Sequence, residues 1–148
     1  MVHSSVHIPS VLLERLERYV RSCLPQEACG ALLGHTEGEY IHISQFTAIP
    51  NIAADPLHHF EFDGPNWVTC VMREKALIGI FHSHPASPPV PSEEDLRQLQ
   101  LFGPGLTVYL ITGSDHSTGG VSTASYVVIS DAVYPSSISL KPVPLSVT

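Results

Sequence analysis

The sequence contains few cysteines and few basic side chains, and each shortage excludes a class of protein. Cys23, Cys29 and Cys70 form an odd set without a CxxC pair, which argues against a disulfide framework and against a thiolate zinc site. Seven Lys and Arg side chains stand against 14 Asp and Glu side chains, which gives a formal net charge of -7. Because this charge repels a phosphate backbone, we do not expect nucleic acid as a partner.

The sequence also lacks an apolar run long enough to span a membrane. Its strongest apolar runs are residues 76–81 and 106–112, whereas a membrane helix needs about 20 such residues. The N-terminus has neither the basic region nor the long apolar region of a secretory signal. We therefore expect no membrane partner and a cytoplasmic location. With 148 residues, 43% of them hydrophobic, the chain is expected to form a single domain over residues 1–148.

The first half of the chain predicts two helices and a β-hairpin. A helix is expected from Ser10 to Cys23, with an apolar stripe of Leu12, Leu13, Leu16 and Val20. Residues 28–34 and 40–49 have the pattern of two strands joined by a turn at residues 35–39. A second helix, with Asp63 as N-cap, is expected to end near Lys75 and to bury Trp67, Val68, Val71 and Met72.

The second half predicts three strands and a short helix. Residues 76–81 have the pattern of a fully buried strand, and residues 106–112 and 125–130 of two more. A helix beginning at Ser92 carries Leu96, Leu99 and Leu101, and the last dozen residues are expected to form an irregular edge segment. This order of elements predicts an α/β (α+β) fold, a mixed sheet with helices packed against it.

Two histidines stand directly after the buried strand. In extended backbone His82 and His84 point to the same face, so each can give one nitrogen to a single zinc ion. An HxH pair alone is, however, also typical of an exposed strand end.

The next helix begins with Ser92-Glu93-Glu94-Asp95, after a stiff proline-rich loop that returns the chain toward the strand end. Such a tetrapeptide has the pattern of a capping box, in which Ser92 and an acidic residue satisfy free backbone donors. If Glu93 and Glu94 meet the electrostatic need of the helix end, Asp95 is free to bind a metal. Two imidazoles and one carboxylate leave the fourth position of a catalytic zinc site open.

A hydrolytic metal site also requires a general base. Glu27 is the candidate, because it lies between the first helix and an apolar strand, where an acidic side chain is otherwise unexpected. An exposed loop glutamate is the alternative interpretation. The same stretch contains Cys29, which we expect to pack rather than to tune the site.

Glu27, the His82-x-His84 pair and Ser92-x-x-Asp95 occur in this order, with seven residues between the pair and Ser92. Together they resemble the signature of the JAMM metallopeptidases, the catalytically competent members of the MPN domain family. The stretches at residues 27–34 and 50–62 are similar to the compact bacterial members. The resemblance covers about residues 24–130.

The resemblance implies an MPN-type fold, a curved mixed sheet with flanking helices similar to that of the cytidine deaminases. It further implies one Zn²⁺ per chain held by His82, His84 and Asp95, with Glu27 as the base that deprotonates the attacking water. Ser92 would donate a hydrogen bond to the oxyanion, and we expect this role to compete with helix capping for one hydroxyl.

Members of the family cleave peptide or isopeptide bonds, often just after the Gly-Gly tail of a ubiquitin-like protein. Residues 47–63 and 86–110 are too short for the insertions that grip ubiquitin in the eukaryotic deubiquitinases of the family. The resemblance therefore favours a small ubiquitin-like or sulfur-carrier protein with a Gly-Gly tail as partner.

Two other functions remain open from the sequence. The chain could be a non-catalytic MPN-type module that binds a protein partner, although the complete five-residue set argues against this. It could also be a peptidase acting on cell-wall peptides, which the lack of an export signal disfavours. We interpret His58 and His59 as loop residues, with lining of the substrate groove as the lesser alternative.

Overall fold

The computed structural model describes residues 2–102, 105–115, 117–130 and 137–148, and these residues form three helices and eight strands. The bounds of the elements, in chain order, are β1 (Ser5–Ile8), α1 (Ser10–Cys23), β2 (Cys29–Glu37), β3 (Tyr40–Ala48), α2 (Gly64–Arg73), β4 (Leu77–His84), α3 (Glu93–Phe102), β5 (Val108–Ser114), β6 (Val121–Ser130), β7 (Ile138–Val143) and β8 (Leu145–Val147). The strands form one mixed sheet in the order β7-β6-β5-β4-β2-β3-β1-β8. None of the described helices combines the length and the apolar character that a bilayer span requires.

The two edges of this sheet are joined by the C-terminal segment. β7 pairs with β6 at one edge, and β8 pairs with β1 at the other, although only Pro144 separates the two strands in the chain. The Pro144 carbonyl accepts a hydrogen bond from the Val6 amide at 3.0 Å. The expectation of an irregular C-terminal segment is therefore wrong, and β1 was not predicted. Both errors concern short strands, which are ordered by pairing with distant strands rather than by local pattern.

Helix α1 packs on one face of the curved sheet. Its range agrees with the prediction, and its buried side chains are Leu12, Leu16 and Val20. These residues share one apolar core with residues of six strands, β1 to β6. A flat sheet could not bring so many strands to a single helix, so the sheet curves around α1.

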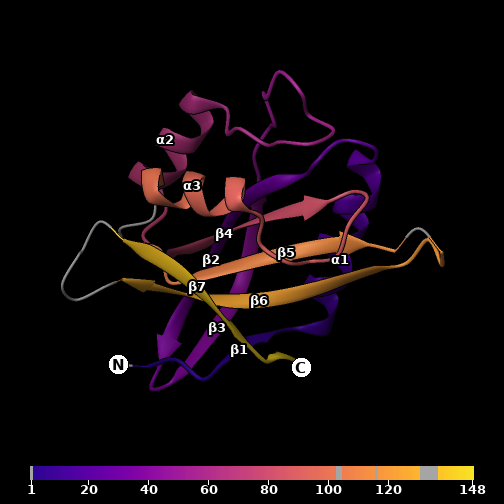
Figure 1. Ribbon diagram of the computed structural model, residues 1–148. Coiled ribbons are helices and arrows are strands. Elements are labelled where there is room, and N and C mark those ends of the chain that lie inside the picture. The colour runs from indigo at the N-terminus through magenta and orange to yellow at the C-terminus, as the bar shows by residue number, and fades with distance from the viewer. Residues whose placement is uncertain (1, 103–104, 116, 131–136) are drawn as a thin grey trace.

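Helices α2 and α3 lie on the opposite face, in the upper part of Figure 1, where Trp67 of α2 packs against the core that holds Leu99 of α3. Alternation along β5 separates the two faces, because Val108 and Leu110 belong to the α1 core whereas Tyr109 and Ile111 pack in the second core, which also holds Leu99 of α3.

The predicted buried face of α2 is wrong. Val68, Val71 and Met72 are 56%, 49% and 79% exposed, and Cys70 is the buried residue of this helix. Trp67 is half-buried and stacks on Phe62 at 4.7 Å. The ten-residue helix has apolar side chains on more than one face, so its sequence does not specify which face meets the sheet. In α3, Leu99 is buried and Leu101 is exposed.

The hairpin of β2 and β3 extends away from α2 and α3, toward the bottom of Figure 1. Its turn consists of Gly38 and Glu39 rather than the predicted residues 35–39, because β2 continues to Glu37. Gly38 has a φ of 60°, the left-handed region that favours glycine, and glycine is preferred at the first position of such two-residue turns.

Candidate metal centre

The two histidines of the HxH pair lie at the end of β4, near the middle of the sheet. His82 and His84 share a face with Ile80, the face that α2 and α3 cover. His82 is fully buried, and His84 is nearly so. The alternative of an exposed strand end does not describe this pair.

Asp95 reaches both histidines from the first turn of α3. Its Oδ1 lies 3.4 Å from His82 Nε2, and its Oδ2 lies 3.1 Å from His84 Nε2. Asp95 Oδ2 also accepts a hydrogen bond from the Ser92 amide at 2.9 Å, while Ser92 Oγ accepts one from the Asp95 amide at 3.0 Å. Asp95 therefore caps the helix and contacts both imidazoles at the same time. The expectation that Glu93 and Glu94 must serve the helix end in its place does not hold.

The donor set fits a zinc ion. His82, His84 and Asp95 each offer a ligand atom, and these atoms lie within 4.8 Å of one another. His84 Nδ1 lies 2.9 Å from the Pro88 carbonyl, an acceptor that places the proton on Nδ1 and leaves Nε2 free as a ligand. Neither ring nitrogen of His82 has a hydrogen-bond partner among the described residues, although both are buried. Carboxylate oxygens face both nitrogens, Glu27 Oε1 at 3.3 Å from Nδ1 and Asp95 Oδ1 at 3.4 Å from Nε2. A metal ion between Nε2 and Asp95 would give that buried nitrogen a partner.

The electrostatics of the cluster favour a cation. Burial disfavours the protonated His82 ring, but the nearby Asp95 and Glu27 carboxylates outweigh it and raise the pKa of His82 to about 9. Burial likewise opposes ionisation of Asp95, yet His82, His84 and the Ser92 amide hold the pKa of its carboxyl well below the usual value. Negative charge is thus concentrated where the three ligand atoms converge.

Glu27 lies beside the histidines, and its side chain is only 6% exposed. Its Oε1 is 3.3 Å from His82 Nδ1. The backbone of Glu27 is held from the loop that follows β3: its amide donates to the Pro56 carbonyl at 2.7 Å, and its carbonyl accepts from Asn51 Nδ2 at 3.1 Å. The alternative of an exposed loop glutamate does not apply, because backbone bonds fix Glu27 next to the ligand set.

Ser83, between the two histidines, was missed by sequence reasoning. It is fully buried and points to the face opposite the ligands, where its Oγ accepts a hydrogen bond from the Ala28 amide at 2.8 Å. Its own amide donates to the Ala28 carbonyl at 3.0 Å. Ser83 thereby fastens the start of β2, and with it Glu27, to the histidine strand. The sequence signal that could have identified Ser83 is its position, a polar residue between two candidate ligands in a strand.

Two aromatic rings fix the plane of the His82 imidazole and were likewise not singled out. Phe60 stacks on it with ring centroids 4.6 Å apart, and Tyr109 meets it edge to face at 5.4 Å. The Phe60 carbonyl accepts a hydrogen bond from Gln98 Nε2 of α3 at 2.7 Å. The loop, the sheet and α3 together leave the ring little rotational freedom.

A cleft of about 440 Å³ opens onto these groups. Glu27, His84, Ser92 and Asp95 line it, so all five predicted residues meet at one site, with His82 buried directly beneath. Ser92 Oγ takes part in the hydrogen bonds of the described residues only as an acceptor. Capping therefore does not consume the hydroxyl hydrogen, and the expected competition between its two roles does not arise.

His58 and His59, which were interpreted as loop residues, also line this cleft from the loop after β3. Cys29 does not. It is buried, its Sγ donates to the Ile49 carbonyl at 3.3 Å, and burial raises the pKa of its thiol to about 12. Cys29 is a packing residue, as expected.

Comparison with known proteins agrees with this architecture. Residues 9–134 match the family model described as prokaryotic homologs of the JAB domain. The solution structure of protein DSY2949 from Desulfitobacterium hafniense superposes with a TM-score of 0.73 at 26% identity, covering 97% of this chain and 92% of that one. The expected α+β fold with a mixed sheet is confirmed.

Two curated relatives show the same kinship in sequence. The desampylase of Haloferax volcanii is 33% identical over 95 residues, 62% of this chain and 65% of its own length. A protein of Thermus thermophilus named "Probable TtuB-protein conjugate cleaving protease" is 28% identical over 114 residues, 74% of this chain and 71% of its own. The chain thus spans about two thirds of the length of the curated relatives that it matches. Because the family model covers most of the sequence, the chain belongs to the prokaryotic JAB-domain family, in agreement with the resemblance to the JAMM metallopeptidases.

Proposed function

We propose that the chain is a zinc-dependent peptidase or isopeptidase of the JAMM type. The observation that carries this proposal is the convergence of two imidazoles and two carboxylates from three separate segments, the loop before β2, β4 and α3, at one cleft. Family membership and the names of the two relatives support it. A binding module without catalysis would have no need for a buried carboxylate next to the ligand set.

His82, His84 and Asp95 would hold the ion. When bound, zinc supplies a Lewis acid that lowers the pKa of a water molecule from about 15.7 to about 7. The protein contributes a rigid set of ligands, since Phe60, the Pro88 carbonyl and the Ser92 amide each fix one of the three side chains.

Glu27 is the general base of the proposed mechanism. Its carboxylate accepts a proton from the attacking water and transfers it to the nitrogen of the scissile amide, so that the C–N bond breaks with a neutral amine rather than an amide anion as the leaving group. The bonds of its backbone to Pro56 and Asn51 keep the carboxylate at the cleft floor. Ser92 donates its unused hydroxyl hydrogen to the oxyanion that forms on the scissile carbonyl.

The cleft favours an extended, slender substrate. It adjoins a second hollow of about 570 Å³, and Ala86 and Ser87 line both. The opposite wall is the short loop after β3, which Asn51 closes with bonds to Ala53, His59 and Glu61. A Gly-Gly tail, which binds in extended form and has no side chains, is a substrate that could follow the two adjoining hollows. We propose that the partner is a ubiquitin-like or sulfur-carrier protein, which agrees with the conjugate cleavage named for the Thermus relative.

Intact mass spectrometry of a sulfur-carrier protein tests the proposal. The carrier is supplied in two forms, one extended by a few residues beyond Gly-Gly and one joined through its terminal glycine to a lysine side chain of a second protein. We expect the zinc-loaded enzyme to release the carrier with a free Gly-Gly end from at least one form. A chelator should abolish the reaction, and added zinc should restore it.

The test variant is Glu27→Gln, and its matched control is Glu14→Gln, which changes an exposed glutamate of α1. We expect the first to stop release and the second to leave it unchanged. Tight binding of both carriers without any cleavage would contradict the peptidase and favour the binding module. Cleavage of cell-wall peptides with no action on either carrier would favour the remaining alternative.

A further inference from the structure

Three histidines form a row across neighbouring strands at the far end of the sheet from the cleft. His35 of β2 lies opposite His42 of β3, and His42 lies beside His7 of β1. The ring centroids of His35 and His42 are 5.0 Å apart and nearly parallel, and those of His7 and His42 are 5.1 Å apart. All three point away from α1, because their neighbours Val6, Ile8, Ile41 and Ile43 belong to the α1 core.

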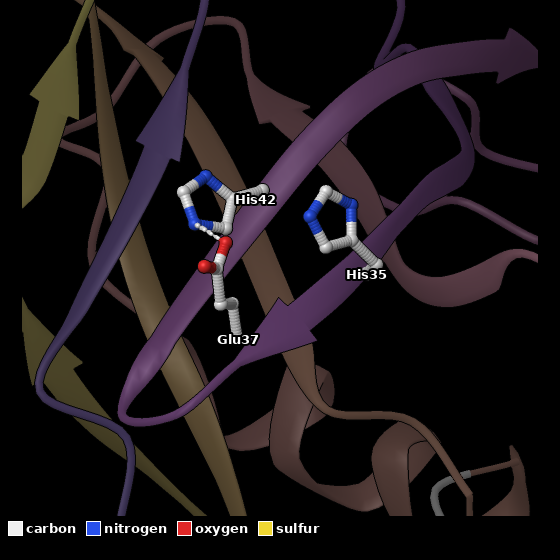
Figure 2. Close-up of side chains that lie close together, drawn as sticks. All are labelled: His35, Glu37 and His42. Atoms are coloured by element: carbon white, nitrogen blue, oxygen red, sulfur yellow. Dashed lines mark ion pairs between the residues drawn. The ribbon is translucent and has the colours of Figure 1, made fainter.

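Glu37 completes a set of metal-binding atoms with two of these histidines. Figure 2 shows its carboxylate beside the His42 ring, and Glu37 Oε2 lies 3.6 Å from His42 Nε2. The ligand atoms of His35, Glu37 and His42 all lie within 4.8 Å of one another. Around a tetrahedral zinc the ligand atoms are about 3.3 Å apart, so rotations of these accessible side chains suffice to close the set.

A β-bulge is the reason that the two histidines face each other. The pairing of β2 with β3 shifts by one residue between Leu33 and Gly34. Without the shift, His35 would lie opposite Ile43, a residue of the apolar core. Directly opposed residues of antiparallel strands share a face, so the shift places His35 on the face of His42. The two-residue turn at Gly38 then keeps Glu37 within reach.

We propose that His35, Glu37 and His42 form a second metal site, which binds one divalent transition-metal ion such as Zn²⁺ or Ni²⁺. Two imidazoles and a carboxylate are the ligands that these ions prefer. The site is separate from the candidate metal centre: His35 is six residues along β2 from Cys29, which pairs with His82, and six residues span roughly 20 Å. A bound ion would link β2 to β3 beside the turn and would stabilise the hairpin against fraying.

Zinc titration of the metal-free full chain by calorimetry tests the site. We expect two ions per chain, one bound tightly and one more weakly. Asp95→Ala should lose the tight ion and keep the weak one, whereas His42→Ala and Glu37→Gln should each lose the weak ion and keep the tight one. Since Glu37 is exposed and His42 is only half-buried, neither substitution disturbs the core.

The control is Glu39→Gln, which removes an exposed carboxylate of the same turn that is not part of the ligand set. It should keep both ions. Thermal unfolding in the Asp95→Ala background gives a second measurement, in which zinc should raise the melting temperature of Asp95→Ala but not of Asp95→Ala/His42→Ala. A single ion in the native chain, or a weak ion retained in both hairpin variants, would overturn the proposal.

Discussion

The candidate metal centre and the second site, the hairpin cluster (His35, Glu37 and His42), have the same types of ligand in opposite surroundings. Each has two histidines and one carboxylate whose ligand atoms lie within 4.8 Å. In the candidate centre the ligands are buried, and Phe60, Pro88 and Ser92 hold them in place. In the hairpin cluster His35 and Glu37 are exposed, and the ring contacts of His42 are with other histidines.

The difference shows that ligand identity does not define a catalytic centre. The buried set lies in a cleft beside the Glu27 carboxylate and the Ser92 hydroxyl, the proposed base and oxyanion donor, whereas none of the described pockets is lined by the hairpin cluster, His35, Glu37 and His42. Burial also lowers the freedom that the ligands lose on binding, so the buried set should bind zinc more tightly. The four predictions below test this contrast.

Removal of a buried ligand should have the largest effect. Asp95→Ala is expected to lose the ion of the candidate centre and to lower hydrolysis on the order of 10⁴-fold, because both the ligand and the Lewis acid are lost. Metal analysis and the carrier assay measure the two losses. Glu93→Ala, an exposed acidic residue of the same helical turn, should retain zinc and activity. Full metal content in Asp95→Ala would refute the ligand assignment.

Replacement of the base should affect the reaction but not the metal. Glu27→Gln is expected to lower kcat/KM by about 10³-fold with one zinc retained at the candidate centre, since general base catalysis contributes about 10²- to 10⁴-fold. Kinetics and metal analysis on the same sample provide the measurement. An active Glu27→Gln enzyme would exclude Glu27 as the base.

Loss of the Ser92 hydroxyl should have two smaller and separable effects. Ser92→Ala is expected to lower kcat by about 10²-fold through the lost oxyanion donor, and the free energy of unfolding by about 1 kcal/mol through the lost cap. Ser92→Thr should restore both, because threonine retains the hydroxyl. If Ser92→Ala loses only stability and keeps its full kcat, Ser92 is a cap without a role in catalysis.

The smallest effect concerns the hairpin alone. Gly38→Ala is expected to cost about 1 kcal/mol of unfolding free energy, because alanine is strained at a φ of 60°, and to weaken the hairpin ion several-fold. The tight zinc ion should remain. Urea unfolding and zinc titration measure these changes, with Gly64→Ala as the control, since a Cβ at Gly64 meets nothing within 4 Å and its φ is ordinary. Equal losses in both variants would argue against a special role of the turn.

Local sequence patterns predicted much of the fold and pointed to Glu27, His82, His84 and Asp95, whereas Ser92 was predicted from pattern only as a helix cap and joined the candidate site through the resemblance to the JAMM signature. Helix α1 follows from its apolar stripe, and the spacing of His84, Ser92 and Asp95 is short enough for one loop to determine their meeting. Sequence reasoning failed where distant pairing decides the outcome. Ser83 and Phe60 matter through partners far along the chain, and the opposition of His35 and His42 depends on a one-residue shift in register that no periodicity reveals.

The junction of the sheet edges at Pro144 has a consequence for how substrate is admitted. The C-terminal segment pairs with β6 on one side and β1 on the other, so neither edge can swing outward without breaking one of these ladders. β4, which carries both histidines, lies near the middle of this closed circuit of strands. Widening of the entrance must therefore come from its walls, the loop after β3 and the proline-rich segment after β4. Under the proposed function, we expect the histidines of β4 to keep their positions when a substrate enters.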